Sequence, residues 1–167
     1  IMNGMIDKYK LDEEKRVLEE DMLFATLDTT VRRICTGNNK DFLLSDTVGF
    51  IHKLPHDLVE AFHSTLEEIE GADLLVHVVD YSDPFYLEQM HTTRQTLSEL
   101  HAGEIPVITV FNKADECESE ASFPKAAGED KIYLSAREEA SICMLADMIL
   151  DKVYADYRRE TFLIPYN

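Results

Sequence analysis

Two polar motifs follow directly after runs of apolar residues, and this arrangement limits the fold more than any other feature of the chain. One motif is Asp46-Thr47-Val48-Gly49, after the run that starts at Phe42, and the other is Asn112-Lys113-Ala114-Asp115, after Pro106–Phe111. Short apolar runs with β-branched residues are typical of buried strands in a parallel sheet. Ligands of such sheets bind at the carboxyl ends of the strands, so the motifs predict a site at that edge.

The remainder of the chain alternates apolar strands with amphipathic helices. We expect Val31–Cys35 and Phe42–Ser45 to form an antiparallel hairpin, because Gly37-Asn38-Asn39 between them tolerates positive φ. Further strands are predicted at 74–79 and 131–134, and helices at 11–20, 58–71, 83–101 and 142–153. This alternation predicts an α/β fold with a largely parallel, doubly wound sheet.

The segment 83–101 shows the helical pattern in detail. Asp83 can cap the amino terminus, and Pro84 suits the first turn. Four apolar residues at helical spacing are then predicted to face the core: Leu87, Met90, Leu97 and Leu100. In the strand before this helix, His77 is surrounded by apolar residues, so we expect a core histidine and not a metal ligand.

The composition of the chain argues against nucleic acid and membranes as direct partners. The 167 residues suit one domain, and the net charge of -17 opposes nonspecific attraction to nucleic acid or to an anionic membrane. The 3 cysteines are isolated from one another, and no apolar run is long enough to span a membrane. We therefore expect a cytoplasmic protein with no membrane partner, in which any RNA contact is made mainly outside this chain.

The motif Asn112-Lys113-Ala114-Asp115 has the chemistry of a guanine site. Guanine presents two adjacent donors, the ring N–H and the exocyclic amine, and the Asp115 carboxylate can accept both. Asn112 can tie the neighbouring loops and reach the base, while the aliphatic stem of Lys113 can lie over the base. Ser135-Ala136, after a predicted strand, can offer a backbone N–H to the guanine oxygen. The alternative is a polar turn without a ligand.

The motif Asp46-Thr47-Val48-Gly49 has the chemistry of the phosphate end of such a site. Asp46 suits a contact to Mg²⁺ through water, because Mg²⁺ keeps several of its waters when bound. Gly49 lets its backbone N–H approach a γ-phosphate closely. Thr26, farther upstream, can complete the magnesium shell only when the γ-phosphate is present, as in a switch. GTP or GDP with Mg²⁺ is therefore the predicted ligand.

A complete site of this kind also needs a glycine-rich phosphate loop. The pattern G-x-x-x-x-G-K-[ST] occurs nowhere in the 167 residues. We expect a P-loop NTPase-type, Ras-like GTPase domain at residues 1–160 that lacks its first strand and phosphate loop, and the start of a C-terminal segment at 161–167. The chain alone is then expected to bind GTP weakly or not at all. The alternative is a non-hydrolysing regulatory binding module, and the residues upstream of Ile1 would separate the two.

Several stretches resemble the GTPase domain of the HflX family of translational GTPases. These are Phe24–Asp28, Asp46–Ile51, Leu54–His56 and the residues 61–62 and 64–68. The resemblance implies that Thr26 is the switch I threonine. It implies that Asp46 and Gly49 form the third GTPase motif, that Asn112, Lys113 and Asp115 form the fourth, and that Ser135 and Ala136 form the fifth.

The same resemblance implies a function for the parent protein. It would bind and hydrolyse GTP with magnesium, associate with the large ribosomal subunit, which stimulates hydrolysis, and help to split or rescue stalled ribosomes. Ile1–Met5 would be the helix directly after the phosphate loop.

Phe50 leads to a prediction about the mechanism of GTP hydrolysis. Ras-like enzymes place a glutamine after the glycine of the third motif to orient the attacking water, and a phenyl ring has no group that can do so. The position is also apolar in the HflX family. We therefore predict that Gly49 and Phe50 lie at the catalytic centre, and that intrinsic hydrolysis is slow until a partner supplies or positions a polar group. A core role for Phe50 is compatible with this prediction.

Overall fold

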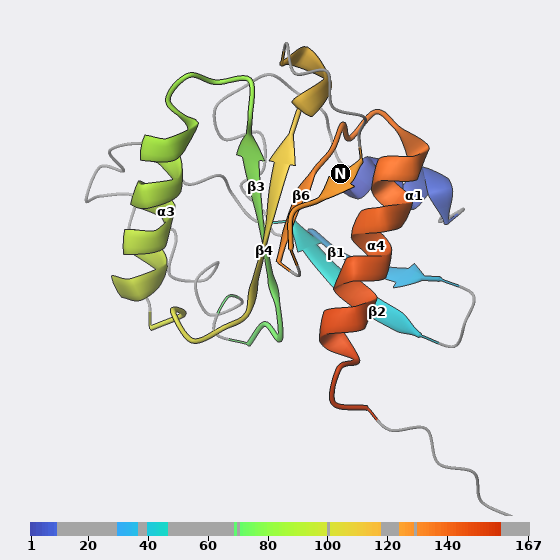
Figure 1. Cartoon of the computed structure of the whole chain (residues 1–167). Helices are drawn as coiled ribbons and strands as arrows, with labels where there is room; N and C mark the ends of the chain where they lie inside the picture. Colours follow the sequence, from blue (N-terminus) through green and yellow to red (C-terminus); the bar gives the residue numbers. More distant parts are fainter. Residues whose placement is uncertain are drawn as a thin grey trace, which may run out of the picture.

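The computed structural model describes residues 1–9, 30–36, 40–46, 69, 71–99, 101–117, 124–128 and 130–157. Figure 1 shows the elements formed by these residues. In chain order they are α1 (Met2–Lys8), β1 (Thr30–Cys35), β2 (Asp41–Asp46), β3 (Leu75–Asp80), α3 (Tyr86–Glu99), β4 (Val107–Asn112), the 3₁₀ helix η2 (Ala114–Glu116), β5 (Lys125–Ala126), β6 (Lys131–Tyr133) and α4 (Glu139–Val153).

The larger sheet has the strand order β3-β4-β6-β5. Its first three strands are parallel, with Val110 of β4 opposite Val78 of β3 on one side and Ile132 of β6 on the other. The carboxyl ends of β3, β4 and β6 therefore lie at the same edge. β5 pairs antiparallel with β6, and two residues are too few to give a strand pattern in the sequence.

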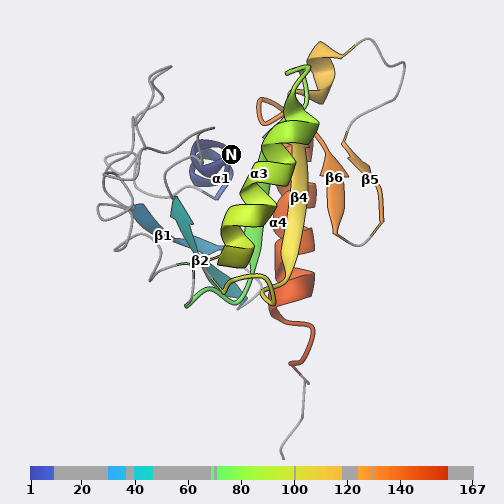
Figure 2. The same cartoon turned by 90° about the vertical axis from the view of Figure 1, so that its left-hand side faces the viewer.

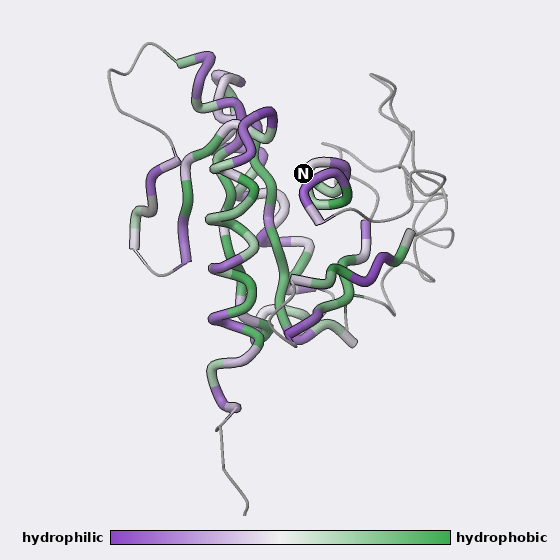
Figure 3. Tube along the Cα trace, turned by 90° about the vertical axis from the view of Figure 1, so that its right-hand side faces the viewer, coloured by the Kyte–Doolittle hydropathy of each residue, from purple (hydrophilic) through white to green (hydrophobic). Residues whose placement is uncertain are grey.

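Helices α3 and α4 cover opposite faces of this sheet (Figure 1 and Figure 2). On the α4 face, Leu145 and Ile149 share a buried cluster with Ile108 and Ile132. On the α3 face, smaller clusters include Met90 and Leu97. Figure 3 shows the hydrophobic trace running along α4 and the strands beside it, as expected when a helix and a sheet bury their apolar faces together. The predicted doubly wound α/β class is confirmed.

The predicted hairpin is also confirmed, but it forms a separate sheet. β1 and β2 pair antiparallel, with Ile34 opposite Phe42, and together they make a two-stranded sheet. Both of these side chains are buried in the same cluster as the inner face of α4. The hairpin is therefore joined to the larger sheet through side-chain packing, and not through backbone hydrogen bonds among the described residues.

The first helix packs against the last. Gly4 of α1 faces Ile142 of α4, and a Cβ at Gly4 would lie 3.0 Å from Ile142 Cδ1, so a side chain there would require the Ile142 side chain to shift. Met5, one residue later, is fully buried in the central cluster. The helix implied at Ile1–Met5 is therefore present.

Two expectations for α3 are wrong in detail. Its first residue is Tyr86, because Asp83 caps a turn before the helix, accepting a hydrogen bond from the Phe85 N–H at 2.8 Å. Leu87 is 65% exposed, whereas Met90 and Leu97 are buried. Leu87 is the second residue of α3, in its first turn. Leu100 lies outside the described residues.

β3 is covered less completely than its apolar sequence predicts. Val79 is buried, but Val78 is 47% exposed. β3 pairs with β4 alone in the described sheet, so it is an edge strand. The helix predicted at 11–20 lies outside the described residues. So does the helix predicted at 58–71, apart from Ile69, which is helical and buried, and Gly71, which lies in a turn.

Candidate functional site

The predicted base-binding residues meet at the carboxyl edge of the larger sheet. Asn112 is the last residue of β4, and Asp115 lies in η2 immediately beyond it. Ser135 and Ala136 follow β6, which is the parallel neighbour of β4. Two segments that are distant in sequence are therefore placed side by side at the top of the sheet in Figure 1, because adjacent parallel strands end at the same edge.

Asn112 joins these two segments. Its Oδ1 accepts a hydrogen bond from the Ala136 N–H at 2.9 Å. The backbone extends the link on both sides, since the Leu134 N–H donates to the Phe111 carbonyl at 3.0 Å and the Ala114 N–H donates to the Leu134 carbonyl at 3.1 Å. The prediction that Asn112 ties the neighbouring loops agrees with this geometry.

The loop after β6 is held by its own hydrogen bonds. Ser135 is buried, and its N–H donates to Ser141 Oγ at 3.4 Å. Ser141 Oγ lies 3.4 Å from a carboxylate oxygen of Glu138, whose N–H donates to the Ser135 carbonyl at 3.0 Å. The N–H groups of Ser135 and Ala136 therefore both have acceptors already. A guanine oxygen at this loop would share the Ala136 N–H with Asn112.

Asp115 and its neighbour are open to solvent. Asp115 is exposed in η2, where a ligand can reach its carboxylate. Glu116, also exposed, lies 3.7 Å from the guanidinium of Arg137, which follows Ala136. This exposed pair adds a weak electrostatic link between the same two loops that Asn112 joins.

Lys113 is held in an uncommon conformation. Its φ of 59° and ψ of 31° lie in the left-handed region, which non-glycine residues rarely adopt. Its Nζ lies 2.6 Å from Asp80 Oδ2, at the end of β3. Asp80 was not among the predicted residues, although it follows an apolar run in the same way as Asp46 and Asn112 do.

Of the residues predicted to lie at the phosphate end of the site, the structure describes Asp46 alone. Asp46 ends β2, and burial raises the pKa of its carboxyl. Asp46 belongs to the two-stranded sheet, so it does not share a sheet with Asn112 among the described residues. Thr26, Gly49 and Phe50 lie outside the described residues.

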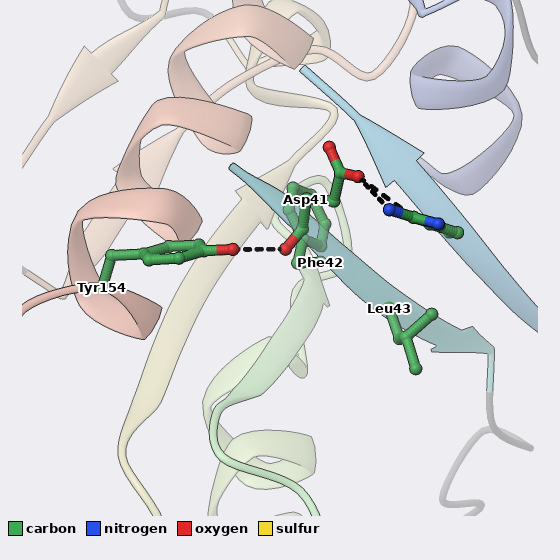
Figure 4. Close-up of a pocket in the computed structure, with 5 residues that line it drawn as sticks. Asp41, Phe42, Leu43 and Tyr154 are labelled. Carbon is green, nitrogen blue, oxygen red and sulfur yellow. Dashed lines mark hydrogen bonds and ion pairs between the residues drawn. The ribbon is translucent and has the colours of Figure 1, made fainter. Parts of the chain in front are cut away.

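The carboxyl end of α4 is anchored to the hairpin, away from the loops after β4 and β6. Tyr154 donates its hydroxyl hydrogen to the Asp41 carbonyl at 2.7 Å, and the Arg33 guanidinium pairs with the Asp41 carboxylate (Figure 4). These residues, with Phe42 and Leu43, line an open pocket of ≈ 330 Å³. The pocket contains none of the predicted site residues, so we assign it a structural role in holding β2 against α4.

The described residues also bear on metal binding, cysteine chemistry and membrane insertion. In the described part of the chain, no group of three or more His, Cys, Asp and Glu side chains is arranged to hold a metal ion. All three cysteines are free thiols, with Cys35 exposed and both Cys117 and Cys143 partly buried. Among the described helices, none combines the length and apolar character that crossing a bilayer requires.

Comparison with known proteins gives two results. A family model described as "50S ribosome-binding GTPase" matches residues 2–113, which include Asp46, Asn112 and Lys113 but not Asp115. The relatives are proteins named GTPase HflX. The chain is 44% identical over 147 residues to the one from Caldanaerobacter subterraneus subsp. tengcongensis, covering 88% of this chain and 33% of the relative.

Two further relatives have the same name. The protein from Escherichia coli is 38% identical over 155 residues, covering 91% of this chain and 36% of the relative. The one from Magnetococcus marinus is 47% identical over 122 residues, covering 72% of this chain and 28% of the relative. The chain thus spans about a third of the length of these relatives.

Proposed function

The chain belongs to the 50S ribosome-binding GTPase family, with HflX GTPases as its relatives, and from this premise we propose that its β4 and β6 loops read guanine for a GTP-hydrolysing protein. The observation that supports this most is the hydrogen bond from the Ala136 N–H to Asn112. It brings the loop after β6 against the loop that contains Lys113 and Asp115. An unliganded polar turn would not require this connection.

Asp115 is proposed to select the base. Its exposed carboxylate can accept hydrogen bonds from the ring N–H and the exocyclic amine of guanine at once. Adenine has no such donor pair. In this arrangement Asn112 keeps its side-chain amide donor for the base while its oxygen accepts from Ala136.

The Asp115→Asn variant of the full-length protein tests this proposal. Asparagine can accept from the ring N–H of xanthine and donate to its 2-oxygen, but it cannot accept two guanine donors. We expect GDP affinity to fall roughly 100-fold and XDP affinity to rise, because two charge-assisted hydrogen bonds are lost. Titration of the two labelled nucleotides measures both effects.

Glu116→Gln is the matched control, since it removes an adjacent exposed carboxylate from the same 3₁₀ helix. Its GDP affinity should stay within about threefold of wild type, because an exposed ion pair contributes little. Equal losses in both variants, or no gain of xanthine binding in Asp115→Asn, would remove the support for base selection by Asp115.

The phosphate end is proposed at Asp46 and the start of α1. Asp46 is the last residue of β2, and α1 shares a buried cluster with that strand through Met5 and Phe42. A carboxylate at this position fits the oxygen ligands that Mg²⁺ prefers. We propose that Asp46 holds Mg²⁺ through water and that Thr26 and Gly49 complete the switch. When bound, Mg²⁺ would neutralise negative charge on the phosphates.

The partner is proposed to be the large ribosomal subunit. The matching family model is described as ribosome-binding, and the chain itself has a net charge of -17. This acidity opposes RNA phosphate, so we infer that most RNA contact is made by other parts of the protein. Cosedimentation of the full-length protein with large subunits should require GTP or a non-hydrolysable analogue and should be weaker with GDP.

A non-hydrolysing regulatory module is the second candidate. It is favoured by Phe50, which stands at the water-positioning place and has no group that can orient the attacking water. The two candidates differ in one measurement, the release of phosphate from GTP by the full-length protein with large subunits present. Multiple turnovers support the enzyme, and binding without turnover supports the module.

A further inference from the structure

Asp80 lies beside the proposed guanine site without belonging to its motifs. It is the last residue of β3 and stands opposite Asn112 in the parallel register of β3 and β4. Its Oδ2 accepts a hydrogen bond from Lys113 Nζ at 2.6 Å. The two side chains are 37% and 46% exposed, so the pair sits at the surface of the site, where a ligand can reach it.

The orientation of the Asp80 carboxylate is set without Lys113. Its other oxygen, Oδ1, accepts from the Ser82 N–H at 3.1 Å and from Ser82 Oγ at 2.6 Å. Burial alone would raise the pKa of Asp80, but the hydrogen bonds from Lys113 and Ser82 outweigh this effect and leave the pKa below its usual value. A fixed, ionised carboxylate therefore faces Lys113.

Lys113 combines a defined backbone conformation with a flexible side chain. Its left-handed backbone directs the chain from β4 into η2, and its long stem has many rotamers in solution. One charge-assisted hydrogen bond at the end of that stem selects a small set of these rotamers. Without it, the stem would lose more rotamers when a base binds, and ordering at that moment weakens affinity.

We propose that Asp80 is a positioning residue of the guanine site, which holds Lys113 through its Nζ so that the aliphatic stem presents one ordered face to the base. The inference rests on the proposed function, because Lys113 must lie over a base for its order to matter. It adds the end of β3 to a site that the motifs place on β4 and β6 alone.

Asp80→Asn in the full-length protein tests the proposal. Asparagine keeps the size and the oxygen that accepts from Ser82, but it removes the charge that holds Lys113. We expect GDP affinity to fall about tenfold, a usual size for coupling between contacting residues. The loss of negative charge by itself would raise GDP affinity, because removing a carboxylate makes the site more attractive to phosphate. Affinity equal to or tighter than wild type therefore overturns the proposal.

Asp83→Asn is the matched control. It removes a carboxylate three residues away, at a position that bonds Phe85 and Gln89 and not Lys113. GDP affinity in this variant should stay within about twofold of wild type, as expected for a site outside the coupled pair. A loss as large as that of Asp80→Asn would show a general charge effect and would count against positioning.

A double-mutant cycle with Lys113→Met separates positioning from a structural role. Methionine keeps an apolar stem but lacks Nζ, so Asp80→Asn should cost about tenfold in the wild-type background and almost nothing in the Lys113→Met background. Equal costs in both backgrounds overturn the proposal. If Asp80→Asn does not fold, Lys113→Met alone must still weaken GDP binding, and unchanged affinity overturns the proposal. If wild type binds no GDP, the proposed function itself fails.

Discussion

Asn112 accepts the Ala136 N–H through its side-chain oxygen at 2.9 Å, and this single hydrogen bond joins the loops after β4 and β6. The bond is partly buried, so neither group is fully compensated by water if the other is removed. The same side chain is proposed to reach the guanine base with its amide nitrogen. Stability of the site and recognition of the base therefore depend on two different atoms of one residue.

Replacing Asn112 should separate these two effects. Asn112→Ala leaves the Ala136 N–H without its acceptor, so we expect a loss of about 1–3 kcal/mol in the free energy of unfolding together with weaker GDP binding. Asn112→Asp keeps an oxygen acceptor but lacks the amide donor, so it should be close to wild type in stability and still bind GDP weakly. Urea unfolding of the chain and GDP titration of the full-length protein measure the two quantities. Wild-type GDP affinity in Asn112→Asp would contradict the assignment.

The hydroxyl of Tyr154 is expected to stabilise the hairpin. Tyr154→Phe removes the hydrogen bond to the Asp41 carbonyl and should cost about 1 kcal/mol in the free energy of unfolding. Tyr157→Phe is the matched control, because Tyr157 is 73% exposed and lies against the Tyr154 ring. Its effect should stay within about 0.5 kcal/mol. Urea unfolding followed by circular dichroism would measure both. Equal costs in the two variants would argue against an anchoring role for Tyr154.

His77 predicts a pH dependence of stability. Burial, and then the positive charge of Arg94, lower the pKa of His77 in the folded chain. The unfolded chain therefore takes up a proton first, near pH 6.5, so this contribution to stability is fully present above that pH and is lost as the pH falls towards the folded pKa. The urea midpoint should decrease between about pH 7.5 and 5.5. His77→Gln should reduce that decrease, and His91→Gln, at an exposed position, should not. An identical slope in His77→Gln would exclude His77 as the cause.

Phe50 is predicted to limit intrinsic hydrolysis. In the full-length protein, Phe50→Gln introduces the group that Ras-like enzymes use to orient water, so phosphate release without a partner should increase. Phe50→Leu keeps the position apolar and serves as the control. If Phe50→Gln folds and binds GTP yet hydrolyses it at the wild-type rate, the water-positioning argument loses its support.

Much of the fold could be predicted from local pattern. Apolar runs located β3, β4 and β6, and the turn residues between β1 and β2 predicted their hairpin, because strands and tight turns are determined by neighbouring residues. The exposure of individual side chains was less predictable. The exposure of Leu87 and of Val78 depends on whether another element covers that position, and no local spacing shows this.

The assignment of Asn112 and Asp115 to guanine stays a prediction, made from the donor and acceptor types of the residues and the base. The structure adds that the loop with Ser135 and Ala136 lies at the same edge, because β6 is the parallel neighbour of β4. The sequence did not show which amides of that loop are already bonded. Those bonds depend on Ser141 and Asn112, which come from α4 and β4 and approach the loop only in the folded chain.

The sequence by itself determined the α/β class, the two polar motifs and the chemistry that each motif can perform, because residue type and short-range periodicity are sufficient for these. Only the tertiary structure decided that Asp80 faces Lys113 and that Asp46 belongs to a separate two-stranded sheet. Both facts depend on which strands become neighbours, and that choice is made by the packing of side chains distant in sequence around the shared core.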